Sequence, residues 1–89
     1  MATLYIYIAA SCPGCTTARI HAAEMQKLRP QYRVECIDLS LPGMVQPPYI
    51  FGTPTYCLDE RVIALGNPSL PALLRIIDTT IHSHEGTGG

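Results

Sequence analysis

The sequence predicts a small α/β domain built on a four-stranded mixed sheet. Three observations carry this prediction: a strand–helix–strand unit at the start of the chain, a strand pair further along, and a closing amphipathic helix. A chain of 89 residues has the length of one domain. We assign residues 1–78 to that domain and residues 79–89, where the apolar pattern fades, to a flexible C-terminal tail. The helices are expected on the faces of the sheet.

The first unit begins with Thr3–Ile8, whose apolar residues occupy both faces, as in a central strand that is covered on both sides. A helix is expected over Pro13–Leu28, because proline suits a first helical position and Pro30 cannot extend the helix. One face of this helix carries Cys15, Ala18, Ala22 and Met25. A second strand follows at Tyr32–Asp38, and the crossover is long enough for parallel pairing.

The second half of the chain contains a hairpin and a helix. Leu39–Phe51 is rich in proline and is expected to be a loop. Thr55–Leu58 and Arg61–Leu65 flank the dipeptide Asp59-Glu60, which predicts an antiparallel hairpin. Ser69 can cap a last helix, whose apolar stripe consists of Leu70, Leu73, Leu74 and Ile77.

Composition excludes several classes of function. Six Lys and Arg against seven Asp and Glu give a net charge of −1, so no basic field for nucleic acid exists. The apolar run Leu4–Ala10 has no preceding Lys or Arg and is far shorter than the ~20 residues of a membrane helix. Four cysteines are too few for a secreted disulfide scaffold. We therefore expect a cytoplasmic protein without nucleic-acid or membrane partners, in which paired cysteines are more often catalytic or metal-binding than structural.

The most informative motif is Cys12-Pro13-Gly14-Cys15, which follows a buried strand and opens a helix. A helix N-terminus stabilises a thiolate, because its backbone N–H groups and its dipole favour negative charge. Cys12 lies at the mouth of the turn and is expected to be the exposed nucleophile. Cys15 shares the apolar face of the helix and is expected to be half-buried. Such a pair suits thiol–disulfide exchange, in which one thiol forms a mixed disulfide and the other resolves it.

Other interpretations of the motif stay open. The cysteines can be an inert reduced pair, or half of a metal or Fe–S site whose remaining ligands come from outside, such as a second chain. His21 lies about 120° around the helix from Cys15, and His82 and His84 of the tail are expected to be solvated. A third possibility is a binding adaptor that keeps the fold without turnover.

At this motif the chain resembles the thioredoxin superfamily, over about residues 3–77. The resemblance rests on the order of the elements, on the cysteine motif at a strand-to-helix junction, and on Gly52-Thr53-Pro54-Thr55-Tyr56 before the hairpin. It implies a minimal thioredoxin-like fold and a cis bond before Pro54, beside the cysteines, that leaves the backbone of Thr53 free to pair with a substrate chain. The substrate-binding residues it implies are Pro13, Gly14, Thr53 and Pro54.

The chain departs from the family's usual pattern at several positions. Ser11 and Ile6 stand where thioredoxins carry a Trp and a buried Asp, so the proton relay attributed to that Asp is absent. The chain is more similar to glutaredoxins in its size and in Pro13. However, Ala9 replaces their usual Lys, and Gly66-Asn67-Pro68-Ser69 replaces their Gly-rich acidic segment. Because those features hold glutathione in glutaredoxins, we expect a protein disulfide to be a better substrate than a glutathione mixed disulfide.

Two further cysteines are expected to be structural. In the family's sheet order the first strand lies between the strands that carry Cys36 and Cys57. The two would then lie about 9–10 Å apart, beyond the ~7 Å limit for a disulfide, and we expect both to be small buried hydrophobes. The apolar residues Ile50, Phe51 and Tyr56 are expected to form an exposed docking surface near the site.

The sequence thus predicts a thiol–disulfide oxidoreductase with Cys12 as nucleophile and Cys15 as resolving thiol. No cofactor is implied, because the electrons reside on the two sulfurs. The expected partners are a protein disulfide or small disulfide as substrate and an electron donor, either a reductase or a low-molecular-weight thiol. We expect a monomer. The alternatives are a metal or Fe–S handling protein and a non-catalytic adaptor.

Overall fold

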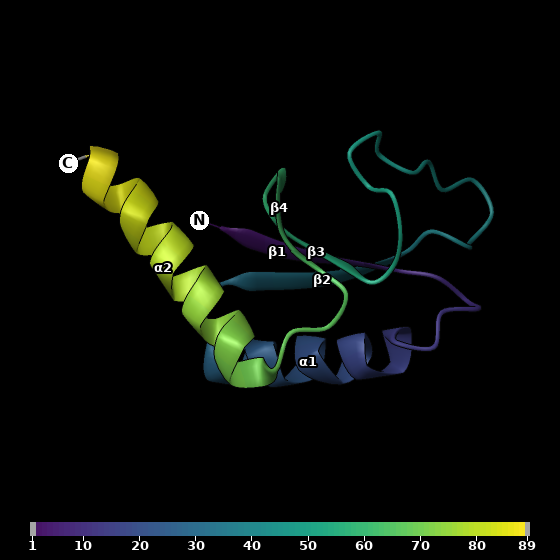
Figure 1. Cartoon of the computed structure of the whole chain (residues 1–89), viewed down its shortest axis with the longest axis horizontal. Helices are drawn as coiled ribbons and strands as arrows, with labels where there is room; N and C mark the ends of the chain where they lie inside the picture. Colours follow the sequence, from purple (N-terminus) through teal and green to yellow (C-terminus); the bar gives the residue numbers. More distant parts are fainter. Residues whose placement is uncertain (1, 89) are drawn as a thin grey trace.

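A computed structural model of the chain describes residues 2–88, with side chains described as far as Ile81. The elements in chain order are β1 (Thr3–Ile8), α1 (Cys15–Leu28), β2 (Arg33–Asp38), β3 (Thr55–Leu58), β4 (Arg61–Leu65) and α2 (Leu70–Gly88). The strands form one sheet in the order β2-β1-β3-β4 (Figure 1), in which β1 pairs in parallel with β2 and antiparallel with β3. The predicted α/β class and four-stranded mixed sheet are confirmed.

Both helices pack against the same face of the sheet. Because successive side chains of a strand point to opposite faces, Leu4, Ile6 and Ile8 of β1 all point to this face. The buried residues that meet them come from α1, α2 and β3, namely Cys15, Ala18, Met25, Leu73, Ile77, Tyr56 and Leu58. The helical stripes read from the sequence are therefore the ones that form the core.

The other face of the sheet is partly covered by the long loop between β2 and β3. In Figure 1 this loop lies on the side of the sheet away from α1. Ile50 of the loop is buried against Tyr7 of β1 and Cys57 of β3. The loop contains five of the large apolar side chains that remain exposed, which are Leu41, Met44, Val45, Tyr49 and Phe51.

The turn between β3 and β4 shows why Asp59 stands where glycine or asparagine is usual. Asp59 has a φ of 56°, in the left-handed region that Asp tolerates better than most residues. Its carboxylate accepts a hydrogen bond from the Thr3 N–H at 3.1 Å, and its own N–H donates to the Thr3 carbonyl at 2.8 Å. The hairpin turn is thereby tied to the start of β1.

The ends of the helices agree with the sequence at some positions and differ at others. Ser69 caps α2 as predicted, since its hydroxyl accepts a hydrogen bond from the Ala72 N–H at 3.3 Å. α1 begins at Cys15, two residues after the predicted start at Pro13, because Cys12–Gly14 form a turn. α2 continues to Gly88, past the predicted domain boundary at residue 78. That boundary and the flexible tail stay predictions. Neither helix, over the described residues, is long and apolar enough to cross a membrane.

Candidate active site at the Cys12–Cys15 turn

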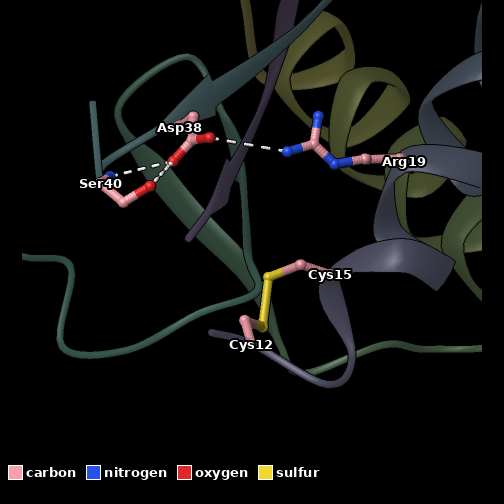
Figure 2. Close-up of polar contacts among 5 residues, drawn as sticks. All are labelled: Cys12, Cys15, Arg19, Asp38 and Ser40. Atoms are coloured by element: carbon pink, nitrogen blue, oxygen red, sulfur yellow. Dashed lines mark hydrogen bonds and ion pairs between the residues drawn. A yellow bond between two sulfur atoms is a disulfide. The ribbon is translucent and has the colours of Figure 1, made fainter. Parts of the chain in front are cut away.

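The candidate site lies where the central strand β1 leads into α1. Cys12 and Cys15 form a disulfide there, with their Cα atoms 5.3 Å apart (Figure 2). The Cys15 N–H donates to the Cys12 carbonyl at 3.1 Å, and the Ala18 N–H donates to the Gly14 carbonyl at 3.1 Å. These two bonds fold residues 12–15 into a turn that brings the Cys12 sulfur against the sulfur of Cys15, the first residue of α1.

The two sulfurs differ in their access to solvent. Cys15 is 3% exposed and belongs to the core with Ala18 and Met25. Cys12 is half-buried and packs at the edge of that core, between exposed Ser11 and exposed Pro13. An attacking or incoming group therefore reaches Cys12 first.

The N-terminus of α1 supplies a favourable field for a thiolate. Its first turn contains no acidic residue, and Gly14 at the N-cap provides no side chain to bond the free N–H groups. The partial positive charge of a helix N-terminus is consequently uncompensated at this end of α1, and it lowers the free energy of a negative sulfur placed there.

The loop before β3 places Pro54 against the turn. The Thr53–Pro54 peptide bond is cis, and Pro54 is buried. A methyl group added to Gly14 would lie 3.4 Å from Cδ of Pro54, which shows how closely the two segments approach. The Gly66 N–H donates to the Pro54 carbonyl at 2.9 Å and so fixes Pro54 to the end of β4. The structure thus brings together all six residues assigned to the site: Cys12, Pro13, Gly14, Cys15, Thr53 and Pro54.

A chain of hydrogen bonds below the turn was missed at the sequence level. Asn67 donates from Nδ2 to the Gly14 carbonyl at 2.7 Å. Its Oδ1 accepts from the Tyr56 hydroxyl at 2.7 Å, and Tyr56 also lies 3.1 Å from Nδ1 of His21. The sequence identified Asn67 only as part of Gly66-Asn67-Pro68-Ser69, which replaces the Gly-rich acidic segment of glutaredoxins. Nothing in its local sequence indicates this contact, because Gly14 lies 53 residues away in the chain.

An ion pair lies near the disulfide but points away from it. Figure 2 shows the Arg19 guanidinium directed toward Asp38, with 3.6 Å between Nη2 and Oδ2. Asp38 also accepts hydrogen bonds from the backbone N–H of Ser40 at 2.9 Å and from its hydroxyl at 2.5 Å. These bonds, with the charge of Arg19, lower the pKa of the Asp38 carboxyl. Arg19 therefore interacts with Asp38 at the end of β2 and not with either sulfur.

Two expectations about buried and exposed residues are wrong. Cys36 is exposed, on a strand, β2, that lies at the edge of the sheet. Ile50 and Tyr56 are almost fully buried, at 2% and 0% exposure, because the loop folds back over one face of the sheet and Tyr56 points into the other. Of the expected docking surface only Phe51 is exposed, at 89%.

The expectation for Cys57 holds, and the register of the sheet separates it from Cys36. Cys57 is buried. Cys36 pairs with Ile6 and Cys57 with Tyr5, on the two strands that flank β1. Since Ile6 and Tyr5 point to opposite faces of the sheet, the two thiols do as well. Burial raises the pKa of the Cys57 thiol. Cys36 is exposed as a residue, but partial desolvation of its sulfur raises the pKa of that thiol as well, against the lowering effect of the Arg19 charge.

A metal site needs ligands close together. Within the part of the chain whose side chains are described, no three His, Cys, Asp or Glu residues are clustered in a way that could hold a metal ion. The side chains of His82 and His84 lie outside that part. The metal-handling alternative therefore requires ligands in addition to the Cys12–Cys15 pair, as the sequence already indicated.

Comparison with known proteins adds a match of fold. No protein-family model and no curated protein matches the sequence. Among solved structures, thioredoxin O2 from Arabidopsis thaliana in the oxidised state superposes with a TM-score of 0.71 at 14% sequence identity, over 89% of this chain and 74% of that one. The chain therefore has a thioredoxin-like fold, with the Cys12–Cys15 disulfide at the junction of β1 and α1.

Proposed function

We propose that the protein is a thiol–disulfide oxidoreductase that uses Cys12 and Cys15 as its redox couple. The observation that carries the proposal is the disulfide itself, at a helix N-terminus, with one sheltered and one accessible sulfur. A purely structural disulfide needs neither the accessible sulfur nor the uncompensated helix end. The thioredoxin-like fold supports the proposal.

The proposed exchange has two steps. The Cys12 thiolate attacks a substrate disulfide, forms a mixed disulfide with one substrate sulfur and releases the other as a thiolate. The Cys15 thiolate then attacks the Cys12 sulfur, which closes the Cys12–Cys15 disulfide and releases the second substrate thiolate. Two electrons have passed to the substrate. An external thiol reductant, either a reductase or a low-molecular-weight thiol, returns the couple to its dithiol form.

Thr53 and Pro54, with Pro13 and Gly14, are proposed to receive the substrate. Pro54 packs against the turn, and Thr53 beside it remains half-exposed. The backbone of Thr53 can therefore pair with an extended substrate segment that carries the disulfide. We further propose that the protein is a monomer that acts on protein disulfides in a reducing cytoplasmic compartment.

The roles of the two cysteines are tested by trapping. In Cys15→Ser the mixed disulfide through Cys12 cannot be resolved, and it should accumulate with a model protein disulfide. Cys12→Ser is the matched control and should trap none. Iron, zinc and sulfide are measured in the wild-type protein and in both variants, all purified under reducing conditions. Equal trapping by the two variants contradicts the assigned roles, and a bound metal or cluster that requires both cysteines favours the metal-handling alternative.

A further inference from the structure

We infer that Asn67 is a positioning residue for the Cys12–Cys15 couple, which holds the turn through the Gly14 carbonyl and so stabilises the disulfide relative to the dithiol. This inference deepens the proposed function and rests on it in one respect, since the disulfide must be reversible. Asn67 touches neither sulfur in any contact described above. Its action passes through the backbone between the two cysteines.

The orientation of the Asn67 amide is set by its partners. The Gly14 carbonyl accepts only, so the amide must present its NH₂ group there. Its oxygen is then left to accept the hydrogen bond from the Tyr56 hydroxyl. A flipped amide would set two acceptors against each other at Gly14. One arrangement of Asn67 therefore satisfies both contacts, and it aims a donor at the turn.

Tyr56 and His21 stabilise this orientation of the Asn67 amide through hydrogen bonds. The Tyr56 side chain is fully buried, and burial raises its pKa to about 12, so the hydroxyl keeps the proton that it donates to Asn67. Because the Tyr56 hydroxyl hydrogen is donated to Asn67, the Tyr56 oxygen can only accept a hydrogen bond from His21. Nδ1 of His21 is therefore the donor and carries a hydrogen. The three side chains come from α1, from β3 and from the segment after β4. The turn is thereby tied to three parts of the fold.

The same contact contributes more net free energy in the oxidised protein than in the reduced one. In the oxidised protein the bond between the two sulfurs already restrains the turn. After reduction that covalent restraint is gone, so the bonds to the Gly14 carbonyl from Asn67 and Ala18 must themselves offset the entropic cost of ordering the turn, and less of their free energy remains as stability. A turn held in shape keeps the two thiols at a high effective concentration, which favours reclosure of the disulfide.

The test is the equilibrium of the couple with dithiothreitol. In this reaction the protein disulfide gains two electrons and two protons to become two thiols, while dithiothreitol loses them and forms its cyclic disulfide. The ratio of the two protein forms in buffers of known dithiothreitol composition gives the reduction potential without any turnover assay.

For Asn67→Ala we expect the equilibrium constant for disulfide formation to fall by about two- to tenfold, the range for one hydrogen bond. At 29.6 mV per tenfold, the potential becomes about 9 to 30 mV more positive. Tyr56→Phe removes the hydroxyl that orients Asn67, and its shift should have the same sign. The double variant should shift no further than Asn67→Ala alone, because both changes act through one contact.

Gln26→Ala is the matched control. Gln26 also bridges backbone groups with its amide, donating to the Tyr32 carbonyl at 3.0 Å and accepting from the Val34 N–H at 3.3 Å, but it does so away from the turn. Its loss should lower stability and leave the potential unchanged. Denaturation of the oxidised and reduced forms of each variant provides a second readout, in which Asn67→Ala destabilises the oxidised form more than the reduced form, as the thermodynamic cycle between folding and disulfide formation requires.

The outcomes separate the inference from the proposed function. A wild-type couple that equilibrates, together with an Asn67→Ala potential that is unchanged or more negative, overturns the role of Asn67 and leaves the proposed function intact. A wild-type disulfide that does not exchange with dithiothreitol at all overturns both. A positive shift in Asn67→Ala and Tyr56→Phe, with none in Gln26→Ala, supports the inference.

Discussion

Cys15 is buried in the core beside Ala18, whereas Cys12, to which it is bonded, remains accessible at the mouth of the turn. This difference arises from the helix, because Cys15 is its first residue and begins its apolar face, while Cys12 precedes it. One sulfur is therefore available to an outside disulfide and the other only to its neighbour.

The first prediction concerns thiol reactivity. In the reduced protein near pH 7, Cys12 should react with iodoacetamide at least about tenfold faster than Cys15, because the thiolate is the reactive form and access to Cys15 is blocked. The measurement is mass spectrometry of timed samples in a Cys36→Ser background, which removes the other exposed thiol. Equal rates, or a faster Cys15, would contradict the assignment of nucleophile and resolving thiol.

The second prediction tests the close approach of the turn to its neighbours. Gly14→Ala places a methyl group 3.0 Å from Nδ2 of Asn67 and 3.4 Å from Cδ of Pro54, so one of them must move. We expect a loss of stability of ~1–3 kcal/mol from this overpacking, measured by chemical denaturation. Gly52→Ala is the control, because a methyl group there meets nothing within 4 Å. Equal stabilities of the two variants would show that a methyl group at position 14 fits beside Asn67 and Pro54 without cost.

The third prediction separates the two cysteines outside the site. Cys57→Ser buries a hydroxyl in the apolar cluster with Tyr7 and Ile50, and should cost ~1–3 kcal/mol of stability. Cys36→Ser lies on the exposed edge strand and should change stability by less than ~0.5 kcal/mol. Neither change should alter disulfide exchange by Cys12 and Cys15. A large loss of disulfide exchange in Cys36→Ser would instead show that the Cys36 thiol takes part in the reaction.

Local pattern predicted the fold and the centre of the site well. The apolar run in Thr3–Ile8, which occupies both faces of the strand, and the three- and four-residue spacing from Cys15 to Met25 depend on neighbours in the chain, and both define the core that forms. The cysteine pair needed only its place between a strand and a helix to be assigned to one turn.

The failures all depend on contacts between distant segments. Cys36 is exposed on β2, which lies at the edge of the sheet, a place that no spacing within β2 indicates. Ile50 is buried because an irregular loop folds back over the sheet. Asn67 meets Gly14 across 53 residues of sequence, so its role emerges only when the chain has closed.

The fourth prediction concerns glutathione. By the resemblance to glutaredoxins, Ala9 and Gly66-Asn67-Pro68-Ser69 replace the residues that hold glutathione in those proteins, so charge-assisted contacts worth ~1.5–3 kcal/mol each would be lost. Two such losses weaken binding by roughly a hundredfold or more. Steady-state rates should therefore favour a protein disulfide over a glutathione mixed disulfide. Ala9→Lys should narrow that preference, and a wild-type preference for the glutathionylated substrate would show that other residues bind the tripeptide.

The last prediction concerns stability at alkaline pH. Burial, followed by a hydrogen bond with Tyr49, raises the pKa of Tyr7 from 10.0 to about 12. Below pH 10 the phenol is protonated in both the folded and the unfolded chain, so the stability linked to it is fully present. Between pH 10 and 12 the unfolded chain releases the proton while the folded chain retains it, so the free energy of unfolding falls as the pH rises.

Tyr7→Phe removes this titration and should flatten the decline, by at most ~1.4 kcal/mol per pH unit. The measurement is denaturant unfolding of wild type and variant from pH 8 to 12, compared by slope because the lost hydroxyl also shifts the absolute value. Tyr56, whose pKa burial also raises to about 12, contributes in the same direction and remains in both proteins. Parallel curves for Tyr7→Phe and wild type would mean that the Tyr7 phenol ionises as easily in the folded protein as in the unfolded chain.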